Sequence, residues 1–206
     1  MIQYHNNHLI DDAGDEYTIL GWAYKCGDGM PITKYALPRR VFSACAGAAI
    51  YQKEVFDKIG YFDENFFAYM EDVDISYRAL IYGYKNMYCA DAKVEHIGSA
   101  TSGGKYNAFK VRLAARNNIY VAYKNMPLLQ YIINLPFLLL GYAIKYVFFT
   151  KIGFEKEYRE GFIEGIKTLG NIKKEPFKLT NILNYIYIEW LLIKNMFKYI
   201  TIKIFK

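Results

Sequence analysis

Residues 60–74 read Gly60-Tyr61-Phe62-Asp63-Glu64-Asn65-Phe66-Phe67-Ala68-Tyr69-Met70-Glu71-Asp72-Val73-Asp74, and this stretch decides how the first part of the chain is organised. Its centre is typical of a turn, and a helix is expected from Glu71 to Tyr82. Acidic residues in the first turn and a glycine, Gly83, just after the last turn are common signals of a helix start and a helix end. The stretch therefore predicts an aromatic-rich loop that leads into a helix whose first turn carries carboxylates.

Glu71 and Asp72 are the candidate catalytic carboxylates. At a helix N-terminus, unpaired N–H groups and the helix dipole stabilise the ionised form, and a fixed carboxylate beside a pocket accepts a proton from a substrate hydroxyl. The competing interpretation is helix capping alone, which needs no substrate. Asp74 and Arg78 are four residues apart, so we expect an ion pair on one helix face. Residues 72–74 also match the loose Asp-x-Asp pattern of metal–nucleotide sites, but they fall inside a helix, so we discount this match.

The surrounding sequence predicts an α/β domain over residues 1–125. Apolar patterns and turn residues place short strands at Tyr17–Tyr24, Val41–Tyr51, Asn86–Cys89 and Lys93–Ile97, and further helices at Lys53–Ile59 and Asn107–Lys124. A strand–glycine loop–helix unit of the kind that opens a nucleotide-binding fold is not found in the first 40 residues.

His96 is the candidate metal ligand. It falls at the end of an expected strand and just before a Gly/Ser/Thr loop at residues 98–106. A neutral imidazole in such a place can ligate a divalent metal. The alternative interpretation is a histidine that is simply polar surface or a satisfied core residue.

The character of the chain changes at residue 126. Residues 1–125 contain 14 Lys and Arg and 14 Asp and Glu, whereas residues 126–206 contain 12 and 6. The apolar run Leu128–Thr150 is long enough to span a bilayer. Its interruptions, and the basic amphipathic patterns over Phe154–Leu169 and Phe177–Ile204, favour helices that lie in the interface of an anionic membrane. A soluble helical bundle is the third interpretation.

Other features exclude some locations and partners. Cys26, Cys45 and Cys89 are scattered, which is typical of reduced thiols in the cytosol. The first residues lack the basic start and apolar run of a signal peptide. Basic residues without a recognition motif do not indicate nucleic-acid binding, so we expect no nucleic-acid partner. The expected location is the cytoplasmic face of the cell membrane, peripheral or with one to two spanning helices.

A larger set of residues occurs in one order along the chain. It consists of Cys45-Ala46-Gly47-Ala48-Ala49-Ile50, Lys53-Glu54-Val55-Phe56, Ile59-Gly60, Phe62-Asp63-Glu64, Phe67, Glu71-Asp72-Val73-Asp74, Arg78, Gly83-Tyr84, Ala92, Val94, His96, Gly98-Ser99-Ala100-Thr101 and Arg116-Asn117-Asn118. Together these residues resemble the second half of family 2 inverting glycosyltransferases, especially the rhamnosyltransferase-like branch that builds bacterial surface polysaccharides. The resemblance covers roughly residues 10–126, and the apolar, basic tail is similar to the C-terminal region of these enzymes.

The resemblance implies roles for the carboxylates. In this family the Asp of the Glu-Asp pair is the general base, which implies that Asp72 deprotonates an acceptor hydroxyl. The hydroxyl then attacks C1 of the donor sugar and inverts the anomeric centre. Glu71 and Asp74 are expected to orient the base and the acceptor.

The resemblance also implies a donor site. Gly47 and Ala48 correspond to a turn whose backbone approaches the donor sugar, and Arg116 corresponds to a basic residue that faces the phosphates. His96 corresponds to a histidine that helps to hold the divalent metal on the donor pyrophosphate. The family begins with a Rossmann-like half that ends in an Asp-x-Asp motif, and this chain shows no such half. Tight binding of Mn²⁺ or Mg²⁺ is therefore expected to need that missing motif.

These inferences combine into one expected fold and function. The fold is the acceptor-side half of a GT-A-type domain, residues 1–125, followed by membrane-associated amphipathic helices, residues 126–206. The function is transfer of a sugar from a nucleotide-diphosphate sugar to a lipid-linked or cell-surface polysaccharide acceptor, by a truncated or split enzyme that needs a separate donor-binding half. The alternative is a non-catalytic, membrane-peripheral partner of a glycan-assembly complex.

Overall fold

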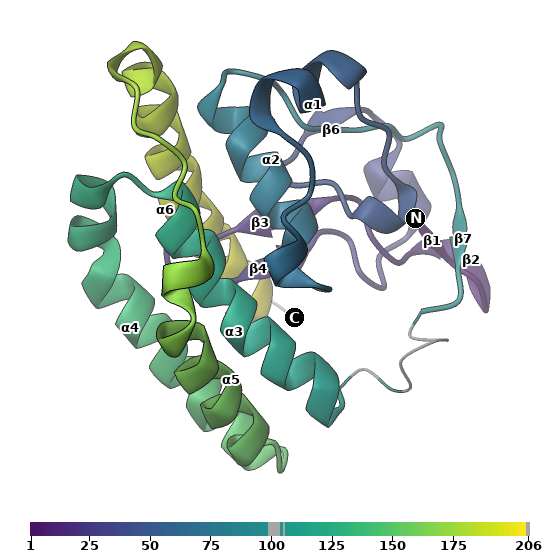
Figure 1. Ribbon diagram of the computed structural model, residues 1–206. Coiled ribbons are helices and arrows are strands. Elements are labelled where there is room, and N and C mark those ends of the chain that lie inside the picture. The colour runs from purple at the N-terminus through teal and green to yellow at the C-terminus, as the bar shows by residue number, and fades with distance from the viewer. Residues whose placement is uncertain (99–103, 105, 205–206) are drawn as a thin grey trace.

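The β-structure of the protein is divided among small sheets. A computed structural model describes residues 1–98, 104 and 106–204 (Figure 1). The sheets in these residues are β2-β1-β7, formed by β1 (Ile2–Gln3), β2 (Asn6–Ile10) and β7 (Glu95–His96), the pair β3 (Asp15–Tyr17) with β4 (Ala23–Lys25), and the pair β5 (Arg39–Arg40) with β6 (Met87–Tyr88). The pairing of β1 with β7 is parallel and aligns Gln3 with His96, so the first strand lies beside a segment far along the chain.

Helices account for most of the remaining structure. They are α1 (Lys53–Ile59), α2 (Glu71–Ile81), α3 (Ala108–Asn125), α4 (Leu128–Lys151), α5 (Glu155–Lys167) and α6 (Ile182–Ile204). Single turns of 3-10 helix occur at Ile32–Tyr35 (η1), Ala46–Ala48 (η2), Glu64–Phe66 (η3), Leu169–Asn171 (η4) and Leu179–Asn181 (η5). The expected mixture of α and β structure is confirmed. The helices also begin and end within a few residues of the predicted limits, except that α6 starts five residues after Phe177.

Some predicted strands differ from the structure. The prediction of a strand over Val41–Tyr51 is wrong, because Ser43 makes only an isolated bridge with Asp15 and the following residues form η2. The run of small residues that follows supplies few of the β-branched side chains that favour strands. The short strands predicted near Tyr17–Tyr24 correspond to β3 and β4, which form a hairpin in which Thr18 N–H donates to the Trp22 carbonyl at 3.0 Å. The loop predicted over residues 98–106 falls largely outside the described residues.

One hydrophobic core joins both parts of the chain. Tyr17 and Tyr77 are fully buried in it, with ring centroids 6.1 Å apart. Leu138 of α4 and Ile188 and Leu192 of α6 are fully buried in the same cluster. The composition changes at residue 126, but the helices that follow pack on the same core as the first 125 residues.

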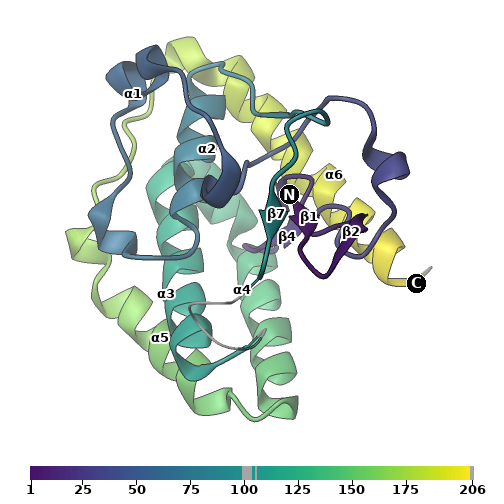
Figure 2. The same ribbon diagram turned by 90° about the vertical axis from the view of Figure 1, so that its right-hand side faces the viewer.

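The helices after residue 107 pack closely because glycines occupy the contacts. A Cβ atom on Gly161 of α5 would lie 2.1 Å from the carbonyl oxygen of Arg112 in α3. A Cβ atom on Gly141 of α4 would lie 1.9 Å from the carbonyl oxygen of Leu20. Figure 1 shows α3, α4 and α5 together on the side of the molecule away from β1, β2 and β7, and Figure 2 shows the same arrangement from the side.

The outer faces of α4 and α6 are apolar. Among the described residues, α4 is the one helix that is long and apolar enough to cross a membrane. Its inner face carries Asn134, Leu138 and Gly141, which are buried, and Asn134 donates to Glu189 of α6 at 2.8 Å. Its exposed large apolar residues include Leu128, Leu129, Ile132, Ile133, Phe137, Leu139, Leu140, Ile144, Val147 and Phe148. This composition is compatible with membrane association.

Candidate functional site

The loop before α2 has an unusual backbone. Phe67, Tyr69 and Met70 have φ angles of 61°, 68° and 70°, a region that residues with bulky side chains rarely adopt. Met70 is the residue directly before Glu71, the first residue of α2. Such conformations persist only where the surroundings impose them, and they are concentrated at functional sites. The loop therefore fixes how the first turn of α2 is presented.

Asn117 of α3 holds this loop in place. Its buried side-chain amide donates to the carbonyl oxygens of Phe66, Ala68 and Tyr69 at 2.9, 2.8 and 2.7 Å. The amide has two N–H groups, so one of them is shared between two carbonyls, and together these contacts fix the backbone path over residues 66–69. The sequence prediction missed this role, since nothing in the local pattern links residue 117 to a loop 50 residues earlier.

Arg116 has a structural role beside Asn117. Its guanidinium donates to the carbonyl oxygens of Asn65 and Phe66 at 3.1 and 2.9 Å and pairs with Glu164 of α5 at 3.1 Å. The side chain therefore bridges the loop and α5. A contact with donor phosphates, as the resemblance implied, requires the guanidinium to leave these partners.

Asp74 is buried in an ion-pair network. Its side chain has no exposed surface, and it pairs with Arg78 at 2.8 Å, which confirms the predicted ion pair. Lys124 of α3 bridges Asp74 and Asp63 at 3.0 and 2.7 Å, and the amide of Asn125 donates to Asp74 at 2.9 Å. In this geometry the Asp74 carboxylate is enclosed by Arg78, Lys124 and Asn125, whereas the resemblance implied that it orients the acceptor. Its contribution to the site is to fix α2 against α3.

Asp72 lies in the first turn of α2 and has a different environment. Its Oδ1 accepts from the N–H of Val73 at 2.8 Å, and its Oδ2 accepts from the N–H of Ala46 at 3.4 Å. The hydroxyl of Ser43 donates to the Asp72 backbone carbonyl at 3.1 Å. None of the ion pairs among the described residues involves Asp72. Burial raises the pKa of this carboxyl, and the negative charge of Asp12 adds to the effect, although the backbone N–H groups oppose it.

Glu71 shares these surroundings. Burial raises the pKa of its carboxyl, and the charge of Asp72 raises it further. Its Oε2 is buried and has no hydrogen-bond partner among the described residues. The first turn of α2 therefore presents two adjacent carboxylates, neither of which is neutralised by a basic side chain in the described part of the chain.

Gly47 and Ala48 lie in η2, close to Asp72. Ala46, the first residue of η2, supplies the N–H that reaches the Asp72 carboxylate. Both Gly47 and Ala48 are exposed, and a Cβ atom on Gly47 would meet only the sulfur of Cys45, at 3.7 Å. The turn thus leaves open space beside Gly47, next to the residue whose N–H reaches Asp72.

Two further aspartates lie near Asp72. The N–H of Asp15 donates to the Ser43 carbonyl at 2.8 Å, which ties the loop at residues 11–15 to the residue that contacts Asp72. Burial raises the pKa values of Asp12 and Asp15, and each is raised further by its acidic neighbours. Sequence analysis did not single out these two aspartates, so this part of the site was missed.

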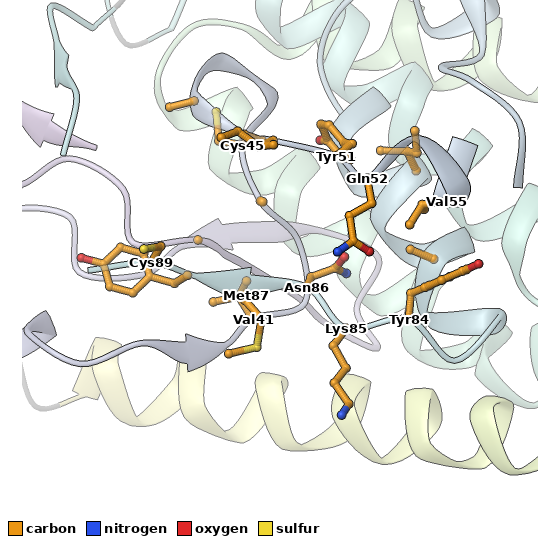
Figure 3. A pocket seen from close by; sticks show the side chains of 18 of the residues that line it. Val41, Cys45, Tyr51, Gln52, Val55, Tyr84, Lys85, Asn86, Met87 and Cys89 are labelled. Carbon is orange, nitrogen blue, oxygen red and sulfur yellow. The ribbon is translucent and has the colours of Figure 1, made fainter. Parts of the chain in front are cut away.

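A cavity of about 590 Å³ lies beside this group. Its lining includes Asp12, Cys45 and Ala48, and Figure 3 shows Cys45 and Tyr51 on one side with Met87 and Cys89 on the other. Burial and the neighbouring carboxylates raise the pKa of the Cys45 thiol to about 12. The thiol therefore stays protonated at neutral pH and forms a small, uncharged part of the cavity wall.

His96 is engaged elsewhere. Its Nδ1 lies 2.8 Å from Asp11, which also pairs with Lys25 at 3.1 Å. Burial opposes ionisation of Asp11, but the hydrogen bonds from His96 and Lys25 lower the pKa of this carboxyl overall. His96 thus takes part in a small surface ion-pair network that ties β7 to the end of β2.

The described residues contain no group of three or more His, Cys, Asp or Glu side chains arranged to hold a metal ion. No known protein family, curated protein or solved structure matches this chain.

Proposed function

We propose that this chain is the acceptor-side part of an inverting glycosyltransferase of the GT-A type, with Asp72 as the general base. The observation that carries the proposal is the state of Asp72. Its carboxylate lies in the first turn of α2, has a raised pKa and belongs to no ion pair among the described residues. Asp74, two residues later, is fully neutralised by Arg78 and Lys124. Helix α2 thus carries one acid with a structural role, Asp74, and one that we propose as the base, Asp72.

The proposed reaction begins when a carboxylate oxygen of Asp72 accepts the proton of an acceptor hydroxyl. The deprotonated oxygen of the acceptor attacks C1 of the donor sugar, the bond from C1 to the nucleotide diphosphate breaks, the diphosphate leaves, and the configuration at C1 inverts. A base with a raised pKa is a stronger proton acceptor, and general-base catalysis contributes typically about 10²–10⁴-fold. The rest of the rate enhancement must come from groups that stabilise the negative charge on the leaving diphosphate.

The donor and its Mn²⁺ or Mg²⁺ remain a proposal that rests on the resemblance. The described residues do not fit a metal centre, because His96 pairs with Asp11 and no third ligand joins them. We propose that a separate donor-binding half supplies the cation site and the nucleotide cradle.

We propose that the enzyme acts at the cytoplasmic face of a membrane on a lipid-linked or polysaccharide acceptor. The apolar outer face of α4 supports this location. Its inner face packs on the core through Leu138 and Gly141, so we propose that α4 lies along the membrane surface rather than across it. A helix held along the domain in this way keeps the site near the headgroups, where a lipid-linked acceptor is presented.

The proposal is tested by sugar transfer. The purified chain is mixed with the protein encoded next to it, Mn²⁺, a radiolabelled UDP- or dTDP-sugar and membrane lipid extract as acceptor. We expect transfer with the neighbouring protein present, and loss of about 10²-fold or more with Asp72→Asn. Asp57→Asn, in an exposed acid of α1, is the matched control. Full turnover by Asp72→Asn would remove the base assignment.

A non-catalytic membrane-peripheral partner is the second candidate function. The wide apolar surface of α4 and α6 favours it, since large exposed apolar patches often mark interaction sites. It predicts that the chain increases transfer by another glycosyltransferase equally well with Asp72 or Asn at position 72. The two functions therefore differ in the dependence of transfer on this one side chain.

A further inference from the structure

A second cavity lies between the β5–β6 pair and α6. It has a volume of about 520 Å³, which is within the range of small-ligand sites. Its lining includes Arg40 of β5, Lys85 of the segment before β6 and Lys194 of α6. Figure 3 shows the Lys85 side chain directed away from Cys45 and Tyr51, toward the pale yellow helix α6. Three segments that are far apart in the sequence therefore bring three cations to one cavity.

The positive charge of this cavity is not neutralised by the acidic side chains around it. None of the ion pairs among the described residues involves Arg40, Lys85 or Lys194. Glu16, the acid in the cavity lining, is paired with Lys198 at 2.9 Å, and its side chain is only 9% exposed. A cleft lined by charges of one sign concentrates ions of the opposite sign. The charge of the cavity therefore selects an anionic ligand.

The side of the cavity that α6 forms is aromatic. Tyr187 and Trp190 both line the cavity, and their rings stack at a centroid distance of 5.9 Å. The ammonium group of Lys194 lies 4.7 Å from the centroid of the Trp190 ring. Trp190 also belongs to an apolar strip of exposed residues, spaced three or four apart and so on one helix face, which consists of Leu183, Ile186, Trp190, Ile193 and Phe197. The apolar strip of α6 therefore reaches the edge of the cationic cavity.

An anion that carries hydrocarbon chains fits both features. Trp and Tyr side chains are enriched at the level of the lipid headgroups. Lys and Arg beside the apolar face of an interfacial helix bind anionic lipids. A soluble phosphate compound or a nucleic acid would neutralise the cations but would leave the apolar strip in contact with water. The combination of cations, stacked aromatic rings and an apolar strip therefore favours a membrane lipid.

We propose that this cavity binds the phosphate group of an anionic membrane lipid, with Arg40, Lys85 and Lys194 around the phosphate and the acyl chains along the apolar strip of α6. The proposed function uses only the outer face of α4 to reach the membrane. The cavity adds a second membrane contact and gives the protein a preference for negatively charged headgroups. This inference does not rest on the proposed function, because lipid binding requires neither Asp72 nor a donor sugar.

The test is flotation of the purified chain with lipid vesicles. Phosphatidylcholine vesicles are compared with vesicles that also contain phosphatidylglycerol, and we expect the second kind to bind about tenfold or more tightly. This preference should be lost when the three cations of the cavity are removed together, as Arg40→Gln, Lys85→Gln and Lys194→Gln. A control variant removes the same charge from exposed lysines that do not line the cavity, as Lys34→Gln, Lys58→Gln and Lys93→Gln, and should keep most of the preference. All six side chains are exposed, so both variants should fold, and thermal melts check this.

The outcomes separate a lipid from other anions. Equal binding to both kinds of vesicle, or an equal loss of preference in the cavity variant and the control variant, would overturn the proposal. Calorimetry with inorganic phosphate and UDP tests the soluble source. Binding of either one that disappears in the cavity variant, without a preference for anionic vesicles, would assign the cavity to a soluble phosphate compound and overturn the lipid assignment. Retention on single-stranded DNA without that preference would overturn it as well. Lipid binding without sugar transfer would refute the proposed function alone.

Discussion

Asn117 of α3 and Tyr69 of the loop before α2 are joined by a hydrogen bond of 2.7 Å between the side-chain amide nitrogen and the backbone carbonyl oxygen. The same amide reaches the carbonyls of Phe66 and Ala68. Through these contacts α3 holds the loop in which Phe67, Tyr69 and Met70 have positive φ angles, and so fixes the start of the helix that carries Asp72. The candidate site is therefore positioned from a helix that contributes no catalytic group.

Replacement of Asn117 by Ala tests this coupling. It removes one donor from each of three carbonyls, of which that of Phe66 keeps the N–H of Ala68 and the guanidinium of Arg116. We therefore expect the free energy of unfolding to fall by about 1–3 kcal/mol. Transfer activity should fall further than stability explains, because the loop that presents Asp72 relaxes. Urea unfolding and transfer assays measure the two effects. Asn118→Ala is the control, since the Oδ1 of Asn118 has no partner among the described residues, and an equal loss in both variants would contradict the assignment.

The sequence predicted some of this arrangement and missed the rest for identifiable reasons. Periodicity and end signals located α2, and the spacing of Asp74 and Arg78 gave their ion pair, because both depend on residues within one helix. The contact from Asn117 to the loop and the position of Asp12 beside Asp72 depend on chain segments far apart, and no local pattern encodes them. The positive φ angle of Tyr69 could not be predicted from the sequence either, because tyrosine rarely adopts this conformation.

The buried network around Asp74 should be critical for stability. Lys124→Ala leaves Asp63 without its lysine and removes one of the two cations on the fully buried Asp74. Breaking a buried ion pair by removing one partner costs about 3–5 kcal/mol. Lys53→Ala is the control, because the Lys53–Asp57 pair is exposed and such pairs contribute about 0–1 kcal/mol. Urea unfolding compares the two variants, and similar small losses would show that Asp74 does not depend on Lys124.

The raised pKa of Asp12 predicts a defined dependence of stability on pH. A carboxyl whose pKa is higher in the folded state than in the unfolded state binds more protons when folded, so its contribution is favourable below the unfolded pKa and is lost as pH rises through the folded pKa. For Asp12, the pH range over which this stabilising contribution is lost therefore begins near pH 3.8 and extends upward. We expect Asp12→Asn to be more stable relative to wild type at pH 7 than at pH 4. Urea midpoints at both values measure this, and a constant difference would show that the pKa is not raised.

Close packing of α5 on α3 predicts intolerance at Gly161. A methyl group there would lie 2.1 Å from the Arg112 carbonyl oxygen, so Gly161→Ala must push the helices apart. Overpacking of this kind costs about 1–3 kcal/mol. Gly170→Ala is a matched control, since no atom lies within 4 Å of the added Cβ. Thermal unfolding should show a lower melting temperature only for Gly161→Ala, and an unchanged value would mean that α5 is free to shift.

The outer face of α4 predicts how the chain binds membranes. Leu129, Ile132 and Ile133 expose more than half of their surface, and burial of such side chains in an apolar phase is worth about 1.5–3 kcal/mol each. The triple serine variant should therefore bind phosphatidylcholine–phosphatidylglycerol vesicles at least about tenfold more weakly in flotation assays. Leu37→Ser, in an exposed leucine outside α4, should change little. Because the inner face of α4 is fixed to the core at Gly141, we also expect alkaline carbonate to release the protein from membranes. Retention after carbonate would mean that α4 leaves this position and spans the bilayer.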